Sequence, residues 1–290
     1  MQAFQKIGLI GRLESDTVLD TVRELVGLLS SRQVEYLVER SIAERLDDLV
    51  VPQAERDSIG ELCDLAIVVG GDGSLLGAAR HLAGHPCAVL GINRGRLGFL
   101  TDIRPEWVRR DVSAVLDGHF TIEQRFLLDA IVERDQQAIS WGEALNDVVI
   151  NSGRSARMIH FDLFMDGEFV YRQDSDGLIV STPTGSTAYA LSGGGPIMHP
   201  DLDALVLVPM FPHTLSARPI VVAGDTEVEV VIRDCHPYVS CDGQVHLNAA
   251  PGDIVRMRKK PQGLRLVHVN SHNFYAACRD KLGWSNRLVQ

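Results

Sequence analysis

Long apolar runs are missing from this sequence, and so is the layout of an export signal. No stretch of about 18 apolar residues occurs, so we expect no transmembrane helix and no membrane partner. The N-terminus, MQAFQKIGLIGR, has no charged segment followed by an apolar one, which predicts a cytoplasmic protein. With 45% hydrophobic and 23% charged residues over 290 positions, the chain is predicted to be soluble and globular, with one large or two ordinary domains.

Signals for a metal framework or a nucleic-acid partner are also missing. The five cysteines are odd in number and form no CxxC spacing, which indicates reduced thiols. His81 and His85 are four residues apart, but Gly84 and Pro86 break the helix that would pair them. The net charge of −10 argues against nucleic acid as the main partner, because phosphate backbones attract clustered Lys and Arg.

Strand and helix patterns alternate over about the first 118 residues. Apolar strands are predicted at 6–11, 34–38, 64–69 and 86–92. Helices are predicted after Ser15-Asp16, at 75–83 and at 105–118. The alternation predicts an α/β N-terminal domain with a Rossmann-like parallel sheet over residues 1–118.

Period-2 patterns and turn pairs dominate from residue 119 onward. A hairpin is predicted at 161–172 around Asp166-Gly167, and the strand pattern continues at 226–232, 245–258 and 264–269. We therefore expect a β-rich C-terminal domain, an antiparallel sandwich, over residues 119–275. The final segment, 276–290, regains helical spacing and is expected to pack back on the N-terminal domain.

The stretch IVVGGDGSLLGAA (67–79) sets a carboxylate in a glycine turn between a strand and a helix. Such turns lie where open α/β sheets bind ligands, and their glycines allow positive φ and close ligand approach. The spacing GxGxxxG is one residue too long for the dinucleotide fingerprint, and no Gly-Lys pair exists for a P-loop. Asp72 is therefore either a turn former, with Ser74 capping the helix, or a group that handles a proton or a metal beside phosphates.

Two further stretches carry polar groups at strand ends. In DSDGLIVSTPTGSTAYALSGGGPI (174–197), hydroxyls and a short helix follow a strand at 178–180, which suits phosphate or ribose binding or else a capped β-turn. Asn146-Asp147 interrupts an apolar run and either faces a cleft or caps a turn. An adenine or a ribose diol suits that pair, because Asn donates and accepts while Asp accepts from hydroxyls.

Taken in order along the chain, these motifs resemble those of the NAD kinase family. The resemblance spans residues 5 to about 275 and rests on GGDG at 70–73, NxxxLGFLT at 93–101, Asn146-Asp147, DGLIVSTPTGSTAYALSGGGPI at 176–197 and SCDGQ at 240–244. GGDG alone is shared with diacylglycerol and sphingosine kinases and with phosphofructokinases, whereas the block at 176–197 is highly specific. The resemblance implies an α/β domain, a β-rich domain and a site between them.

The resemblance also implies an activity. Such kinases transfer the γ-phosphate of ATP, or sometimes of polyphosphate, to the 2′-hydroxyl of the adenosine ribose of NAD, giving NADP. They use a divalent cation, usually Mg²⁺, and commonly assemble as dimers or tetramers. By this resemblance Asp72 is the general base that accepts the hydroxyl proton.

Further site residues carry over by position. The implied NAD-binding set is Asp72, Gly73, Phe99, Asn146, Asp147, Arg157, Asp174, Asp176, Thr187, Ala188, Tyr189, Ala190, Leu191, Ser192 and Gln244. The implied phosphate loop is Gly70, Gly71, Gly73, Ser74 and Arg94, with Arg96 nearby. Phe99 is either a wall of the adenine pocket or a core aromatic, and the two arginines either meet ATP phosphates or are solvated. No protein ligand is assigned to the metal, because ATP can hold it.

Three other interpretations use part of the same pattern. A lipid kinase shares GGDG, but the acidic net charge and the polar STPTGSTAY block (181–189) count against an apolar acceptor. A non-catalytic NAD-binding regulator would keep the pocket without needing a carboxylate at the acceptor hydroxyl. An oxidoreductase that uses NAD as a redox carrier would need a working dinucleotide fingerprint.

Overall fold

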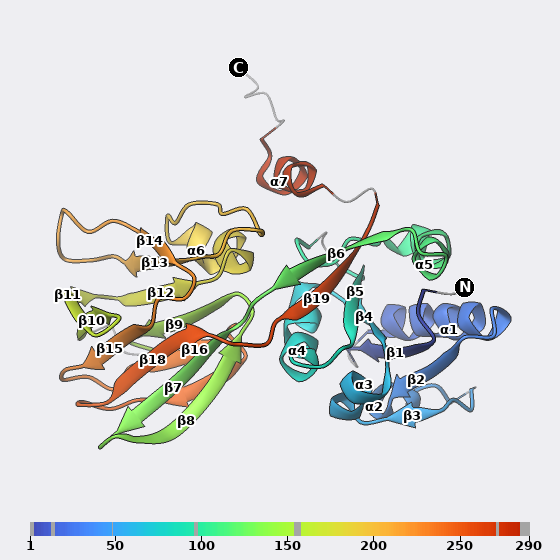
Figure 1. The fold of residues 1–290 in the computed structure, drawn as a ribbon, viewed down its shortest axis with the longest axis horizontal. Coiled ribbons are helices and arrows are strands. Elements are labelled where there is room, and N and C mark those ends of the chain that lie inside the picture. The colour runs from blue at the N-terminus through green and yellow to red at the C-terminus, as the bar shows by residue number, and fades with distance from the viewer. Residues whose placement is uncertain are drawn as a thin grey trace. The chain divides into compact units, whose positions relative to one another are not determined.

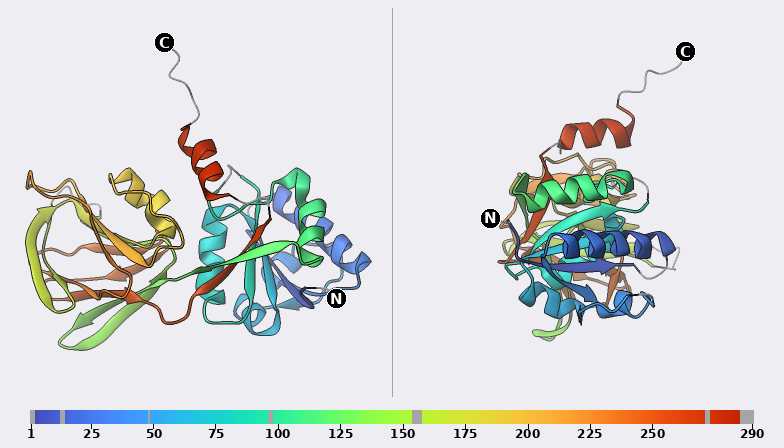
Figure 2. Two further views of the ribbon diagram at one scale, coloured as in Figure 1. Left: turned by 45° about the horizontal axis from the view of Figure 1, so that its top comes forward. Right: turned by 90° about the vertical axis from the view of Figure 1, so that its right-hand side faces the viewer.

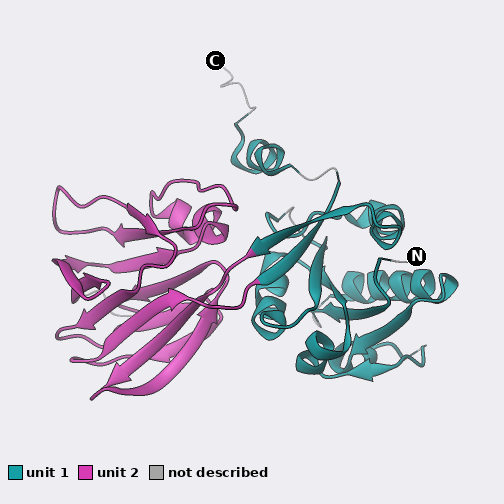
Figure 3. Cartoon of the chain, in the orientation of Figure 1, with its two compact units in different colours: residues 1–124, 264–290 teal, residues 125–263 magenta. Residues whose placement is uncertain are grey.

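Contacts divide the chain into two compact units. The computed structural model describes residues 3–12, 15–47, 49–95, 98–153, 158–270 and 273–284. Unit 1 comprises Met1–Gln124 and Leu264–Gln290, and unit 2 comprises Arg125–Gly263 (Figure 3). Unit 1 thus includes 119–124 and 264–275, which the sequence patterns placed in the β-rich domain.

Unit 1 is built on a seven-stranded sheet with the order β3-β2-β1-β4-β5-β19-β6. Its strands are β1 (Lys6–Gly11), β2 (Glu35–Glu39), β3 (Gln53–Ala54), β4 (Leu65–Gly70), β5 (Ala88–Asn93), β6 (Phe120–Arg125) and β19 (Leu264–Val269). The neighbours from β3 through β19 pair in parallel, which confirms the predicted parallel sheet.

Strand β19 corrects one expectation. Its sequence, LRLVHV, continues the period-2 texture of the β-rich region, yet it pairs in parallel with β5, with Leu266 opposite Val89. Five of its six residues are buried, as a strand inside a helix-covered sheet requires. A short alternating run does not specify which sheet it joins.

Helices cover both faces of this sheet (Figures 1 and 2). On one face lie α1 (Asp16–Ser31) and α5 (Val108–Leu116), which is preceded by the 3₁₀ turn η1 (Pro105–Trp107). On the other lie α3 (Arg56–Leu62) and α4 (Asp72–Leu82). The short α2 (Arg40–Ala43) follows β2, and α7 (Phe274–Leu282) follows β19. The helix predicted after Ser15-Asp16 is α1, which buries Val18, Val22 and Leu25, and Ser15 is its N-cap residue without a side-chain cap bond.

Unit 2 is a sandwich of two six-stranded sheets whose strands pair antiparallel, as predicted. The first has the order β11-β10-β15-β18-β7-β8, formed by β7 (Leu128–Arg134), β8 (Gln137–Ala144), β10 (Ile159–Met165), β11 (Glu168–Ser175), β15 (Val228–Ile232) and β18 (Ile254–Lys259). The second has the order β14-β13-β12-β9-β16-β17, formed by β9 (Asp147–Asn151), β12 (Gly177–Ser181), β13 (Ala204–Met210), β14 (Ile220–Ala223), β16 (Tyr238–Cys241) and β17 (Val245–Asn248).

Both sheets contribute to one apolar core, in which Phe161 of β10 and Val180 of β12 are fully buried. The predicted hairpin turn is present, with φ of 50° at Asp166 and 79° at Gly167. The 3₁₀ turn η2 (Thr184–Thr187) and the short α6 (Tyr189–Ser192) follow β12.

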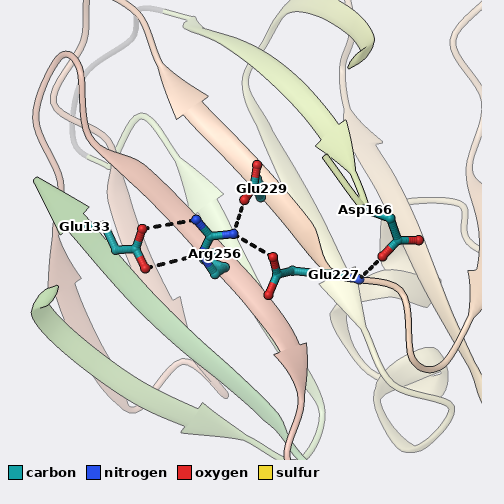
Figure 4. A network of polar contacts seen from close by, with 5 residues as sticks. All are labelled: Glu133, Asp166, Glu227, Glu229 and Arg256. Atoms are coloured by element: carbon teal, nitrogen blue, oxygen red, sulfur yellow. Dashed lines mark hydrogen bonds and ion pairs between the residues drawn. The ribbon is translucent and has the colours of Figure 1, made fainter. Parts of the chain in front are cut away.

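One arginine ties three strands on the outer side of the first sheet (Figure 4). Arg256 of β18 contacts Glu133 of β7 through two nitrogens at 3.2 Å, Glu227 at 2.6 Å, and Glu229 of β15. The Glu227 N–H donates in turn to Asp166 at the hairpin turn, at 2.9 Å. The three carboxylates raise the pKa of Arg256.

Candidate active site

Asp72 is the first residue of α4, directly after β4. Gly71 occupies the N-cap position with φ −96° and ψ −175°, so the positive φ expected of the turn glycines is not used there. No side chain caps the helix, and the Ser74 N–H donates to the Gly71 carbonyl at 2.9 Å. The alternative in which Ser74 is the cap is therefore wrong. Gly70 is needed for space, because an added Cβ would lie 2.3 Å from the Ser74 hydroxyl.

The carboxylate of Asp72 is held by the loop that carries the LGFLT motif. Its Oδ2 accepts the N–H of Phe99 at 2.7 Å. Its Oδ1 accepts the N–H of Leu100 at 3.1 Å and the hydroxyl of Thr101 at 3.2 Å. Because each carboxylate oxygen offers about two lone pairs, Oδ2 keeps one acceptor position for another donor.

Gly98 makes this arrangement possible, and sequence reasoning missed it. A Cβ at this position would lie 1.7 Å from Oδ1 of Asp72 and 2.3 Å from its Cγ. Any side chain there would displace the carboxylate. The signal was available in the sequence, because Gly98 belongs to the same LGFLT motif, but the motif alone does not say which atom the glycine accommodates.

Phe99 contacts a cation, which sequence reasoning also missed. The Nζ of Lys281 in α7 lies 3.9 Å from the centre of the Phe99 ring. Phe99 is half-buried rather than part of a buried core cluster, so the plain core interpretation does not fit. Its role as a wall of an adenine pocket stays a prediction.

A buried histidine anchors the end of the same loop. Nδ1 of His268 in β19 bonds the carboxylate of Asp102, and its Nε2 lies 3.4 Å from Oε2 of Glu123 in β6. Burial lowers the pKa of His268, but the two carboxylates raise it by more, to about 9. The histidine is therefore charged at neutral pH and ties the loop to β19 and β6.

Of the arginines predicted near the phosphates, the structure describes Arg94. Nε of Arg94 donates to the hydroxyl of Thr21 in α1, and the Arg94 N–H donates to the Gly70 carbonyl at 3.0 Å. Its contact with ATP phosphates stays a prediction. Arg96 and Arg157 lie outside the described residues.

In unit 2, Asn146 and Asp147 lie where β9 begins and line a pocket of about 260 Å³. The pocket is also lined by Val149, Asn151, Ala188, Tyr189, Ser240, Asp242 and Gly243. Strand β9 lies between β12 and β16, which sets Asp147 opposite Ser181. Of the two alternatives for this pair, the cleft is the one observed.

Asp242 holds the pair in place, and sequence reasoning did not select it. Its carboxylate accepts the N–H groups of Leu145 at 3.0 Å, Asn146 at 2.8 Å and Asp147 at 3.3 Å. It forms a hairpin turn with Gly243, with φ of 53° and 64°. The Asp-Gly pair in SCDGQ predicts the turn, but not the acceptor role.

Asp147 is the most strongly perturbed carboxyl of this pocket. Burial raises its pKa, the charge of Asp242 raises it further, and an N–H from Tyr189 lowers it, for a value of about 7. Asp147 therefore changes its charge near neutral pH.

Hydroxyls of the STPTGST run (181–187) bond the backbone of unit 2. Thr182 donates to the Leu145 carbonyl at 2.6 Å, and Ser186 donates to the Pro183 carbonyl at 2.7 Å. A Cβ on Gly185 would lie 2.2 Å from the Asn146 carbonyl oxygen. These contacts hold the pocket wall against the segment that carries Asn146, and a ligand role for these hydroxyls stays a prediction.

The predicted NAD-binding residues after this run lie in different surroundings. Ala188 and Tyr189 line the pocket with Asn146, whereas Ala190 is buried in an apolar cluster. Ser192 lines another pocket, of about 580 Å³, together with Tyr189. Thr187 donates to the Thr184 carbonyl at 3.4 Å, and Leu191 is half-buried.

The last predicted residues lie outside this pocket's lining. Asp174 bonds Nδ1 of His160 at 2.6 Å, which raises the pKa of that histidine. Asp176 is exposed, and its N–H donates to the Met210 carbonyl at 3.0 Å. Gln244 is exposed in the hairpin turn, with its N–H on the Cys241 carbonyl at 3.0 Å. Their contacts with NAD stay predictions.

Within the described ranges, no three His, Cys, Asp or Glu side chains are grouped to hold a metal ion. None of the helices in those ranges combines the length and apolar character needed to span a membrane.

An α/β unit with a fixed carboxylate at a helix start, and a β-rich unit with a polar pocket, match what the resemblance implies for a phosphotransferase that acts on nucleotides. The model of the ATP-NAD kinase N-terminal domain matches residues 7–120, and that of the ATP-NAD kinase C-terminal domain matches residues 145–269. The chain belongs to the ATP-NAD kinase family.

Individual relatives agree over nearly the whole length. The chain is 58% identical to the NAD kinase of Pseudomonas putida (strain W619), over 99% of this chain and 98% of that protein. It is 57% identical to the NAD kinase of Azotobacter vinelandii, over 99% of each.

Solved structures of NAD(H) kinases share the fold. Yeast NADH kinase complexed with NADH is similar with a TM-score of 0.90 at 25% identity, covering 99% of this chain and 90% of that one. An NAD kinase from Archaeoglobus fulgidus in complex with ATP has a TM-score of 0.72 at 26% identity, covering 96% and 97%.

Proposed function

We propose that this protein transfers the γ-phosphate of ATP to the 2′-hydroxyl of the adenosine ribose of NAD, giving NADP. Family membership and the close relatives named NAD kinase support ATP-dependent phosphorylation of NAD. The observation in the structure that supports the chemistry is the carboxylate of Asp72, fixed by three donors with one acceptor position left on Oδ2.

In the proposed step, Asp72 is the general base. The ribose 2′-oxygen forms a bond to the γ-phosphorus, the bond from that phosphorus to the β,γ-bridging oxygen breaks, and ADP leaves with the electron pair. The hydroxyl proton moves to Oδ2 of Asp72. A carboxylate can accept this proton because the proton leaves late, as the new bond forms.

The pocket of unit 2 suits a nucleoside. Asn146 can donate and accept at a base or a ribose, and ionised Asp147 can accept from ribose hydroxyls. We assign the adenosine contacts of NAD to Asn146, Asp147, Ala188 and Tyr189, which line this pocket together. The remaining predicted contacts are proposed on the family resemblance alone: Gly73, Phe99, Arg157, Asp174, Asp176, Thr187, Ala190, Leu191, Ser192 and Gln244.

The cation, the cellular location and the assembly are also proposed. Mg²⁺ usually binds through substrate phosphates with few protein carboxylates, so we expect it to arrive with ATP and to neutralise phosphate charge. We expect those phosphates to meet the implied phosphate loop at the start of α4, where helix N–H groups favour anions. The five cysteines are free thiols, which suits a reducing cytoplasm. We expect a homodimer or homotetramer, as the family resemblance implies.

The test is product formation by the purified protein with NAD, ATP and Mg²⁺. We expect NADP, detected with an NADP-specific dehydrogenase, in amounts equal to the ADP released. A protein that binds NAD but forms no NADP would contradict the proposal and favour a regulator. NAD recovered unphosphorylated but reduced would instead favour an oxidoreductase, and phosphorylation of a lipid in place of NAD would favour a lipid kinase.

A further inference from the structure

Lys281 is a cation placed beside the proposed base without a use in the fold. It lies near the end of α7, which begins after the N-cap Asn273 and ends at Gly283 with φ 68°. Its Nζ is 3.9 Å from the centre of the Phe99 ring, and the N–H of Phe99 donates to Asp72. The ammonium and the carboxylate are thus positioned by the same residue.

The ammonium is buried and has no hydrogen-bond partner among the residues that the structure describes. An ammonium carries three donors, and burying them without acceptors is unfavourable. The ring offers only its π face, which attracts the charge but accepts no conventional hydrogen bond. An arrangement of this kind is stabilised when an anionic oxygen binds.

The surroundings of Lys281 bring its pKa close to neutral pH. Burial lowers the pKa of Lys281, and the charges of Asp72 in α4, Asp102 in the loop and Cys278 in α7 raise it, for a value of about 8. The neighbouring His268, bonded to Asp102, adds a positive charge beyond that carboxylate. Lys281 therefore stays mainly protonated at neutral pH and loses its charge above about pH 8.

The other lysines are used differently. The chain has lysines at positions 6, 259, 260 and 281. Lys259 bonds Asp203 at 2.6 Å and Lys260 bonds Glu143, so both are neutralised within unit 2. Lys281, in contrast, interacts electrostatically with Asp72.

We propose that Lys281 binds a terminal phosphate oxygen of ATP and offsets the charge that develops on the transferring group. The proposal rests on the kinase function proposed above and extends it to a further catalytic residue. Fixed cations near a transferring phosphoryl group are a main source of rate enhancement in such reactions, and a site that excludes water strengthens the effect. Lys281 and Asp72 would then act on opposite partners, the phosphoryl group and the hydroxyl proton.

The first test is steady-state kinetics of Lys281→Met and Lys281→Arg. Loss of one charge-assisted hydrogen bond predicts that Lys281→Met lowers kcat/KM for ATP by about 10- to 100-fold. The KM for NAD should stay within about twofold. Lys281→Arg should restore a part of the activity, because the charge is retained. Arg279→Met, an exposed charge change on the same helix, is the matched control and should leave both parameters unchanged.

The pH dependence separates contact from mere packing. In the wild type, kcat/KM for ATP should fall above about pH 8, as Lys281 loses its proton. This fall should be absent in Lys281→Arg up to about pH 10, since a guanidinium stays charged. An unchanged alkaline fall in Lys281→Arg, or a rise confined to the KM for NAD in Lys281→Met, would overturn the proposal.

Binding of ATP without NAD tests the same contact independently of turnover. Titration calorimetry with MgATP should show the 10- to 100-fold loss in Lys281→Met, with melting curves used to verify folding. Equal ATP affinity in wild type and both folded variants would also overturn the proposal. If the wild type formed no NADP at all, the kinase function would fail, and this binding measurement would still decide the role of Lys281.

Discussion

The two units each hold a pair of ionisable groups at their candidate ligand positions, and the pairs differ in sign. In unit 1 the pair is Asp72 and Lys281, of opposite charge. In unit 2 it is Asp147 and Asp242, of like charge. One carboxylate of each unit accepts three hydrogen bonds: Asp72 from the loop 99–101, and Asp242 from the N–H groups of residues 145–147.

The comparison shows how a partner changes the effect of burial. Burial disfavours the charged form of any group. In unit 1 the charge of Asp72 opposes burial, so the pKa of Lys281 stops at about 8. In unit 2 the charge of Asp242 adds to burial, so the pKa of Asp147 reaches about 7. Lys281 of unit 1 thus stays mainly charged at neutral pH, while Asp147 of unit 2 is divided between its charged and neutral forms.

Displacing the fixed carboxylate of unit 1 should have the largest effect. In Gly98→Ala the new methyl group would lie 1.7 Å from Oδ1 of Asp72, so the carboxylate must rotate away from its donors. If general-base catalysis is lost, kcat should fall by about 10³-fold. Coupled assays of NADP formation measure this directly.

Gly27→Ala is the control for that variant. It lies in α1 of the same unit, and no atom lies within 4 Å of the added methyl group. We expect unchanged kcat and slightly higher stability, as alanine favours helix. Wild-type kcat in Gly98→Ala would show that the position of the Asp72 carboxylate does not limit the reaction.

Removing the titrating carboxyl of unit 2 should raise stability and weaken binding. The folded-state pKa of Asp147 is raised above its unfolded value, so its stabilisation is present at acid pH and is lost as the pH rises through about 7. Asp147→Asn removes this loss and should gain about 2–3 kcal/mol over the wild type between pH 5 and pH 8. Its affinity for NAD should fall by about 10-fold at pH 8.

Urea unfolding at the two pH values, with NAD titration at pH 8, measures both effects. Asp242→Asn is the matched comparison, because it weakens the acceptor for three N–H groups and should destabilise at both pH values. If the stability of wild type and Asp147→Asn depended equally on pH, the interpretation that Asp242 raises the pKa of Asp147 would be wrong.

The histidine that anchors the loop of unit 1 should affect stability alone, by an amount similar to that of Asp147. The pKa of His268 is raised to about 9, so its stabilisation is present below about pH 6.5 and is lost as the pH rises through 9. We expect the wild type to lose about 2–3 kcal/mol over this range relative to His268→Gln. Melting temperatures at pH 6.5 and pH 9.5 measure it.

His160→Gln serves as the exposed counterpart, because the His160–Asp174 pair is partly open to solvent and should contribute little. An identical pH dependence of stability in wild type and His268→Gln would mean that His268 is not charged in the folded protein.

The sequence predicts the frame better than the contacts within the site. Helix and strand periods located the parallel sheet of unit 1 and the sandwich of unit 2, because those periods record which faces are buried. They did not place β19, whose short LRLVHV pattern suits either sheet. The sheet it joins is decided by pairing with β5, a partner far away in sequence.

The same limit applies to the site. Asp72, Asn146 and Asp147 could be selected because polar residues at strand ends stand out against apolar runs. Gly98, Asp242 and Lys281 could not be selected for their roles, since each acts through a contact with a residue distant in sequence. For the hydroxyls at 181–186, composition does not reveal whether they also bond the scaffold, as Thr182 and Ser186 do.

The most direct test of the account is the rate of NADP formation by Asp72→Asn beside the wild type, with NAD affinity measured on both proteins. Asparagine keeps the size of the side chain but cannot take the hydroxyl proton. We predict a loss of about 10³-fold in kcat with NAD affinity retained within a few fold. Equal rates in the two proteins would contradict the role of Asp72 as the base and leave the glycine turn as a scaffold.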